Sequence, residues 1–469
     1  MVTWFSQILS WVSTFFVINK LLPEDVGLVG TASIYLTVVQ MLSEFGVGAA
    51  VVRFQSLDRR QLGQFNSLSV MLGLGALVLG SLAAFPTSYF LELPRLTEIM
   101  PVMSIGFLIT SFRVVPQAVL QKQMQFRKIA LIEGTHSLSM ATANITMASL
   151  GFGYWTLALG PIIGALVGTS LMVFNNPMPF RWPKLESIRE PFEFSRQTIF
   201  TRFAWFGYSN VDFLITSKVL GTHAMGVYLI GWQVAGIAVE KITTLVGRVT
   251  PAFFSSLQDN IPELRRYLVI ITEGLATLTF PACVGIALVA PDLVIVLGPQ
   301  WESAAIPLQA LALLAMVRSI DPLIQQALSA IGEARLNLRN AIVTVCILPP
   351  IFFFAAGGWG INGVAIAWLI CGPVLLSRLW FQAMRRLSLA PGQYFAALWP
   401  ATSACLAMTA VVLGVDTALA PDATPMVALI VKSAAGAVTY VATLFVMHRE
   451  RVMRVRHVVQ TLRSRKNET

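Results

Sequence analysis

Charged residues are scarce in this chain of 469 residues, since Asp, Glu, Lys and Arg together make up 12% of it and hydrophobic residues make up 56%. Soluble globular proteins contain about a quarter charged residues. Too few charged side chains are present to cover so much apolar sequence in water. The composition therefore predicts that lipid is the solvent for most of the chain.

Cysteine and histidine are also rare, with four residues of each type. The cysteines stand singly inside apolar runs without Cys-x-x-Cys spacing, and the histidines are scattered: Cys283, Cys346, Cys371 and Cys405; His136, His223, His448 and His457. We interpret the cysteines as small buried hydrophobes. We expect no metal site, because no set of ligands has the spacing that zinc requires.

Catalytic signatures are missing as well. No Gly-Lys dipeptide occurs in the chain, which excludes ATP hydrolysis through a P-loop. No Ser, His and Asp set can be assigned from the positions of these residues. We therefore expect a protein that is not an enzyme and that needs no cofactor.

Long apolar stretches dominate what is present. About 20 apolar residues cross a bilayer as a helix. Met1 leads directly into such a stretch without a basic segment or cleavage site, so we expect a first span there and no signal peptide. The sequence predicts an all-α integral membrane protein of about 14 transmembrane helices, at 3–19, 27–51, 62–85, 99–120, 129–149, 154–174, 197–218, 225–247, 268–290, 304–329, 341–356, 361–381, 395–414 and 426–446.

The basic residues behind the net charge of +10 are distributed as in a protein with a fixed orientation in a membrane. Of the 33 Lys and Arg residues, 25 lie after every second predicted span or in the C-terminal tail. This bias predicts that these segments, and both termini, are cytoplasmic. We therefore expect a multi-pass protein of the bacterial inner membrane and no nucleic-acid partner. The basic tail from Arg449 either binds anionic lipid head groups or only anchors the topology.

Three pairs of segments match weakly across the two halves at offsets of 198, 205 and 206 residues: 20–27 with 218–226, 113–120 with 318–325, and 151–155 with 357–361. The repeat unit is six spans, an even number, so the two halves are parallel. Their symmetry axis would run along the membrane normal, as in two-lobed transporters. The predicted organisation is an N-terminal six-helix lobe, a C-terminal six-helix lobe, two further helices and a basic cytoplasmic tail, at 1–180, 181–390, 391–447 and 448–469.

Segments 21–27, 116–126 and 210–228 resemble, in the same order, the Wzx-type exporters of lipid-linked oligosaccharides. These exporters share a superfamily with MATE-type multidrug antiporters and lipid II flippases. The resemblance implies two six-helix lobes plus two helices. It also implies movement of undecaprenyl-diphosphate-linked oligosaccharide to the outer leaflet, for exopolysaccharide, O-antigen or capsule synthesis. The implied partners are this cargo, membrane lipids and other polysaccharide assembly proteins, with no nucleotide.

A diphosphate cargo requires desolvated cations, and arginine offers a bidentate fork. Arg113 and Arg318 occupy matching repeat positions, each shortly before a proline that loosens the helix. Arg202 lies about one turn into the seventh span. We predict that these three bind the diphosphate, with Arg113 and Arg318 facing the cleft from opposite lobes. Structural ion pairing or snorkelling is the alternative, and Asp321, three residues after Arg318, is its local candidate partner.

Ionisable residues within spans are functional candidates. Asp212, near the middle of the seventh span, either carries a coupling proton or cation or neutralises an arginine. Glu44, deep in the second span, and Asp321 are further candidates for ion coupling or charge pairing. Lys432 lies near a helix end and is expected at the membrane interface.

One other feature leaves alternatives open. Three glycines share one face of the sixth span (Gly160, Gly164 and Gly168) and serve either packing within the lobe or a dimer seam.

Besides the flippase, a cation-coupled drug antiporter and a membrane-embedded glycan polymerase or ligase are the alternative functions. A cationic drug would favour acidic residues over arginines, and a polymerase would need more than the short outer loops seen here.

Overall fold

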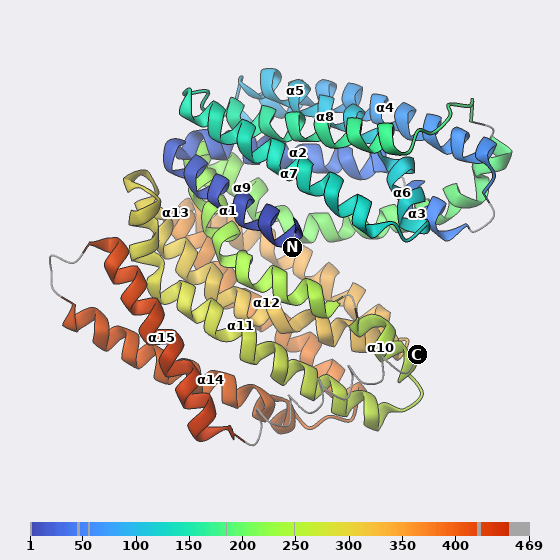
Figure 1. Cartoon of the computed structure of the whole chain (residues 1–469). Coiled ribbons are helices and arrows are strands. Elements are labelled where there is room, and N and C mark those ends of the chain that lie inside the picture. Colours follow the sequence, from blue (N-terminus) through green and yellow to red (C-terminus); the bar gives the residue numbers. More distant parts are fainter. Residues whose placement is uncertain are drawn as a thin grey trace. The chain divides into compact units, whose positions relative to one another are not determined.

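The computed structural model describes residues 2–44, 47–54, 57–183, 185–247, 249–419 and 424–449, and the side chains of these except 2–9, 42–44, 185–209, 238 and 245. Every regular element in these ranges is a helix (Figure 1). The elements are α1 Val2–Lys20, α2 Pro23–Glu44, α3 Val47–Arg53, α4 Arg59–Leu91, α5 Leu96–Ser111, α6 Val114–Lys122, α7 Phe126–Ser149, α8 Trp155–Asn175, α9 Leu185–Gly247, α10 Thr250–Ser256, α11 Ile261–Leu297, η1 Pro299–Ala304, α12 Ala305–Ala330, α13 Ala334–Arg386, α14 Pro391–Ala418 and α15 Pro425–Met447.

The helices are long and apolar, as the composition predicts. Within the described ranges, nine helical segments have the length and hydropathy needed to cross a membrane. The chain is thus an all-α, multi-pass membrane protein, which confirms the predicted fold class, whereas the count of 14 spans stays a prediction. The longest helices, α9 and α13, each hold two predicted spans that meet at a glycine with positive φ, Gly221 (80°) and Gly360 (61°). Glycine adopts this left-handed conformation without steric cost.

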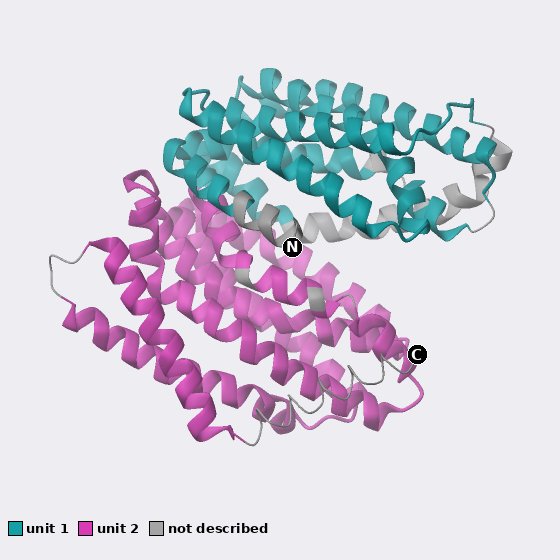
Figure 2. Ribbon diagram, viewed as in Figure 1, with its two compact units in different colours: residues 1–226 teal, residues 227–469 magenta. Residues whose placement is uncertain are grey.

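The chain folds into two compact units, residues 1–226 and 227–469 (Figure 2). Unit 1 includes residues 181–226, which the repeat assigned to the second lobe. The reason is visible at α2: a Cβ on Gly27 would overlap the carbonyl oxygen of Thr222, and a Cβ on Gly226 would overlap that of Pro23. The repeat-matched glycines Gly27 and Gly226 therefore let two backbones touch. The predicted lobes stay a prediction.

Unit 1 has its apolar core between α2, α4, α5 and α8, and α1 packs against α7, which packs against α8. The glycine face of α8 lies on α7. Gly160 approaches the side chain of Asn144, and both Gly164 and Gly168 approach His136. Small residues permit such close contact between helices, so this face packs against α7 within unit 1.

Unit 2 is organised around α11, which packs against α12, α14 and α15, while α12 also packs against α13. One continuous apolar core runs through these helices, with Tyr394 and Phe352 among the fully buried side chains of the unit. The helices α14 and α15 pack against each other and against α11. The two helices outside the repeat are therefore an integral part of unit 2.

Candidate functional site

The helix of the fourth predicted span is broken where the sequence places Arg113. Helix α5 ends at Ser111 and α6 begins at Val114. Pro116 is the cause, since a proline ring clashes with the carbonyl four residues earlier and has no N–H to donate. The Arg113 N–H bonds Thr110 O at 3.1 Å, three residues back, instead of closing an α-helical turn. Arg113 therefore stands at a break in the α-helical hydrogen bonding, inside the candidate membrane span Leu96–Lys122.

The side chain of Arg113 is 18% exposed and lies in a polar network. Its Nε donates to Gln117 Oε1 at 3.1 Å, and Gln117 Nε2 donates to Glu133 Oε1 at 3.3 Å. Arg113 Nη2 lies 3.6 Å from Glu133 Oε1, and the Glu133 side chain is 50% exposed. This ion pair is long and half solvated, so it binds the guanidinium weakly.

Arg113 lines a cavity of about 270 Å³ within unit 1. The lining residues are Gln40, Ser69, Gly73, Phe107, Thr110, Ser111, Arg113, Val114 and Gln117. Arg113 is the one charged residue among these nine. The others supply hydroxyl and amide groups or apolar surface. A cavity with one cation and several neutral hydrogen-bonding groups has the chemistry to hold an anion.

The repeat-matched Arg318, in unit 2, has a different environment. It is exposed, and its guanidinium carbon lies 4.3 Å from the centroid of the Trp232 ring. Asp321 is buried, where it accepts hydrogen bonds from Trp380 Nε1 at 2.9 Å and Gln325 Nε2 at 2.5 Å. The described residues contain no ion pair between Arg318 and Asp321. Arg318 thus stacks on an aromatic ring, while Asp321 organises its own polar cluster.

The remaining predicted residues lie on α2 and α9. Asp212 on α9 is completely buried in unit 1. Five residues further along, the Ser217 hydroxyl lies 3.0 Å from the Thr31 hydroxyl of α2, which joins the two helices. The side chains of Arg202 and Glu44 lie outside the described residues. Diphosphate binding and ion coupling by all these residues stay predictions.

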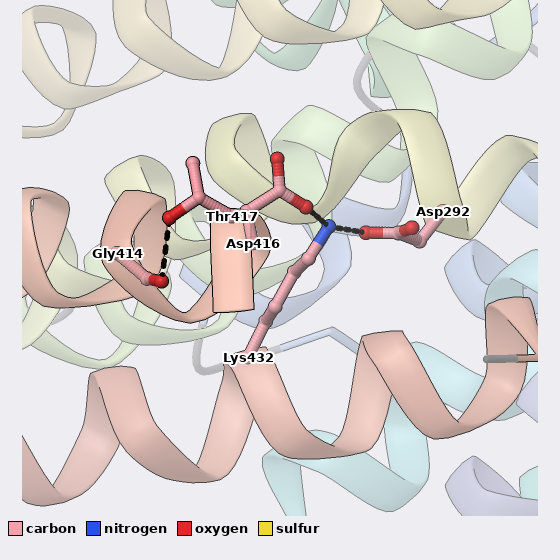
Figure 3. A network of polar contacts seen from close by, with 5 residues as sticks. All are labelled: Asp292, Gly414, Asp416, Thr417 and Lys432. Carbon is pink, nitrogen blue, oxygen red and sulfur yellow. Dashed lines mark hydrogen bonds and ion pairs between the residues drawn. The ribbon is translucent and has the colours of Figure 1, made fainter. Parts of the chain in front are cut away.

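A charged cluster that the sequence did not indicate lies in unit 2 (Figure 3). The side chain of Lys432 on α15 is 8% exposed, and its Nζ donates to Asp292 Oδ2 of α11 at 2.6 Å and also pairs with Asp416 of α14. These side chains are 15% and 54% exposed, respectively. Lys432 therefore ties three helices together. The sequence showed only a charge in an apolar run, because Asp292 lies 140 residues away along the chain and Asp416 lies on the preceding helix.

A family model described as "Polysaccharide biosynthesis protein" matches residues 20–306, more than half of the chain. The chain belongs to this family. The lipopolysaccharide biosynthesis protein WzxC of Escherichia coli K12 is 23% identical over 356 residues, which are 73% of this chain and 71% of WzxC. The probable flippase AglR of Haloferax volcanii is 25% identical over 378 residues, 76% of each chain.

Two solved structures share the fold of this family member. The lipid II flippase MurJ in an inward closed conformation superposes with a TM-score of 0.74 at 14% identity, over 96% of this chain and 98% of MurJ. An inward-facing multidrug resistance transporter of the MATE family, in the MOP superfamily, gives 0.67 at 15% identity, over 81% of this chain and 94% of the transporter. The predicted resemblance to Wzx-type exporters is confirmed, and the fold is that of the flippase MurJ and of the MATE transporter. The proteins that these comparisons describe by activity are flippases and transporters.

Proposed function

We propose that this member of the polysaccharide biosynthesis family is a flippase. It moves undecaprenyl-diphosphate-linked oligosaccharide repeat units from the cytoplasmic to the outer leaflet by alternating access. The protein resides in the bacterial inner membrane with both termini in the cytoplasm, and it works as a transporter without catalytic chemistry. The names of the relatives and of MurJ support this function. Within the chain, the observation that carries it is the cavity around Arg113.

The contacts of Arg113 suit a cargo that arrives and leaves. Its bond to Gln117 orients the guanidinium, while the 3.6 Å contact with Glu133 is long and half exposed. A diphosphate oxygen bonded to the guanidinium forms a shorter charge-assisted hydrogen bond, which is worth about 1.5–3 kcal/mol. The cargo therefore displaces Glu133 at low cost. When it leaves, Glu133 returns and neutralises the cation, so the empty site does not hold an unpaired charge.

Ion coupling is a separate part of the proposal. Asp212 is completely buried on α9, and an ionisable residue within a membrane span is a functional candidate. In this proposal Asp212 carries the coupling ion. If Asp212→Asn leaves the dependence of transport on the ion gradient unchanged, coupling resides elsewhere, or the gradient of cargo alone drives transport.

The leaflet location of the cargo tests the flippase function. Lipid-linked oligosaccharide is probed with a membrane-impermeant glycosidase on right-side-out and inverted vesicles from cells depleted of this protein. We expect build-up on the cytoplasmic face, which wild type reverses and Arg113→Ala does not. Arg127→Ala is the matched control, because Arg127 is an exposed arginine at the start of α7.

Other outcomes point to other functions. An unchanged leaflet distribution with polymer missing would indicate a polymerase or ligase. An unchanged distribution with normal polymer would indicate the drug antiporter. Reversal by Arg113→Ala as complete as by wild type would remove Arg113 from the site.

A further inference from the structure

Unit 2 contains a second polar cavity, of about 420 Å³, between α10, α12 and α13. This volume falls in the range of roughly 300–1,000 Å³ that small-molecule sites occupy. Its lining residues are Pro251, Ser255, Pro322, Gln325, Gln326, Ser329, Ala330 and Asn337. Three of the eight are amides, two are hydroxyls and none is charged.

The amides of this cavity are held in place by groups behind them. The buried Asp321 carboxylate, itself fixed by Trp380, accepts a hydrogen bond from Gln325 Nε2. The hydroxyl of the buried Thr250 donates to the amide oxygen of Gln326. Such preorganisation lowers the entropy cost of ligand binding.

The remaining polar groups are fixed in the same way. Asn337 Nδ2 donates to the backbone oxygen of Gln325 at 2.9 Å and lies 3.1 Å from the Ser329 hydroxyl. The Ser329 hydroxyl also donates to the Gln325 backbone oxygen at 2.8 Å. Two helices, α12 and α13, are thereby joined along the wall of the cavity.

The lining discriminates between ligand classes. A phosphate requires a cation, a cationic drug requires carboxylates or aromatic faces, and a lipid chain requires an apolar wall. The residues that line this cavity provide no cation, carboxylate or aromatic ring, and the apolar surface of Pro251, Pro322 and Ala330 lies beside the amides and hydroxyls. Amide and hydroxyl groups each offer a donor and an acceptor, which matches the donor and acceptor of a sugar hydroxyl.

The internal repeat relates this cavity to that of Arg113. Residues 113–120 match 318–325. The first stretch lines the unit 1 cavity with Arg113 and Gln117, and the second lines the unit 2 cavity with Pro322 and Gln325. At the offset of 205 residues only Gln117 and Pro322 are matched positions that line both cavities, and Arg318, the match of Arg113, does not line the unit 2 cavity. The predicted topology puts both at the cytoplasmic ends of their helices, where the cargo is loaded.

We propose that the unit 2 cavity is a glycan-recognition site, which binds a neutral sugar of the lipid-linked oligosaccharide and so contributes to selection of the cargo. This rests on the proposed flippase function, in which the unit 1 cavity holds the diphosphate common to all such cargoes. Sugar discrimination resides in hydrogen bonds from Gln325, Gln326 and Ser255. Losing one such bond weakens binding about fivefold.

Comparing the binding of two lipids distinguishes recognition of the sugar from recognition of the diphosphate. The full-length protein in lipid nanodiscs is titrated with undecaprenyl diphosphate, and with the lipid-linked repeat unit extracted from the cells that produce it, and binding is read by native mass spectrometry. We expect wild type to bind the glycosylated lipid more tightly. In Gln326→Leu this preference should fall about fivefold, while binding of undecaprenyl diphosphate is unchanged.

Two further variants guard against misfolding and nonspecific effects. Ser255→Leu places an apolar side chain at an exposed rim position, so it blocks hydrogen bonding without disturbing the buried Thr250. It should reduce the preference like Gln326→Leu. Gln393→Leu is the control, because Gln393 is an exposed amide at the start of α14 outside the cavity.

The outcomes separate this site from the flippase proposal. A preference for the glycosylated lipid that survives in both cavity variants would overturn the glycan site and leave the flippase intact. Failure of wild type to bind either lipid would overturn the flippase proposal and this site with it. Loss of preference in the cavity variants, together with weaker binding of both lipids in Arg113→Ala, would support both cavities.

Discussion

Replacing Lys432 by methionine should loosen α14 and α15 from α11. The lysine is 8% exposed and neutralises Asp292, which is 15% exposed. Methionine preserves most of the volume but leaves this carboxylate without its cation, beside a second carboxylate. Breaking a buried ion pair in this way costs about 3–5 kcal/mol, and the partial exposure of Asp292 favours the lower value, about 3 kcal/mol.

The same geometry sets how much stability the protein should lose when each partner residue is replaced. Asp416 is 54% exposed, so Asp416→Asn should cost less than about 1 kcal/mol. The double variant Lys432→Met/Asp292→Asn removes both the cation and the buried carboxylate. Because no uncompensated buried charge remains, it should be more stable than Lys432→Met alone.

Native cysteines provide the assay. Cys283 on α11 and Cys405 on α14 are buried in the helices that Lys432 joins. In a Cys346→Ser/Cys371→Ser background, a thiol-reactive fluorophore reports exposure of these two thiols as the purified protein is heated. Lys432→Met should lower the midpoint clearly, and Asp416→Asn should lower it little. A Lys432→Met midpoint equal to that of the parent, or a double variant no more stable than Lys432→Met, would refute the reasoning.

Three further predictions follow from the structure. Gly27→Ala should destabilise the protein by about 1–3 kcal/mol, because the added Cβ overlaps a backbone oxygen. The control Gly236→Ala, with open space around the added Cβ, should be neutral or slightly stabilising. Equal unfolding midpoints for the two variants would contradict this prediction. Arg318→Lys keeps the charge but loses the flat surface that stacks on Trp232, so stability should fall by about 0.5–1 kcal/mol. Near-normal transport by this variant in the vesicle assay would exclude bidentate phosphate binding by Arg318. The hydrogen bond with His223 at 2.8 Å lowers the pKa of the Glu24 carboxyl, which precedes the apolar part of α2. Ionised Glu24 thus stabilises the fold above its ordinary pKa, and this stabilisation is lost as the pH falls through the lowered pKa. The side chains of Glu24 and His223 are both about half exposed, so Glu24→Gln should abolish less than about 1 kcal/mol of acid-dependent stability. Identical pH profiles of the unfolding midpoint in Glu24→Gln and the parent protein would disprove this role of Glu24.

The membrane fold and the family could be predicted from the sequence because they rest on local signals. A bilayer imposes a minimum length of apolar helix, and every backbone group within it must be hydrogen-bonded locally. The single charge of Arg113 in an apolar run, three residues before a proline, was visible for the same reason. The break in the helix at Arg113 lies where Pro116 removes one backbone hydrogen bond.

The partners of the charged side chains were decided by the tertiary structure. Asp321 is three residues from Arg318, yet its hydrogen bonds run to Gln325 on its own helix and to Trp380 on the next. Lys432 finds its partner Asp292 140 residues away along the chain. Helical periodicity states which residues share a face, but the packing of neighbouring helices determines what that face meets. The sequence therefore determined where charges enter the membrane, and only the packing of the helices decided which are neutralised and which line a cavity.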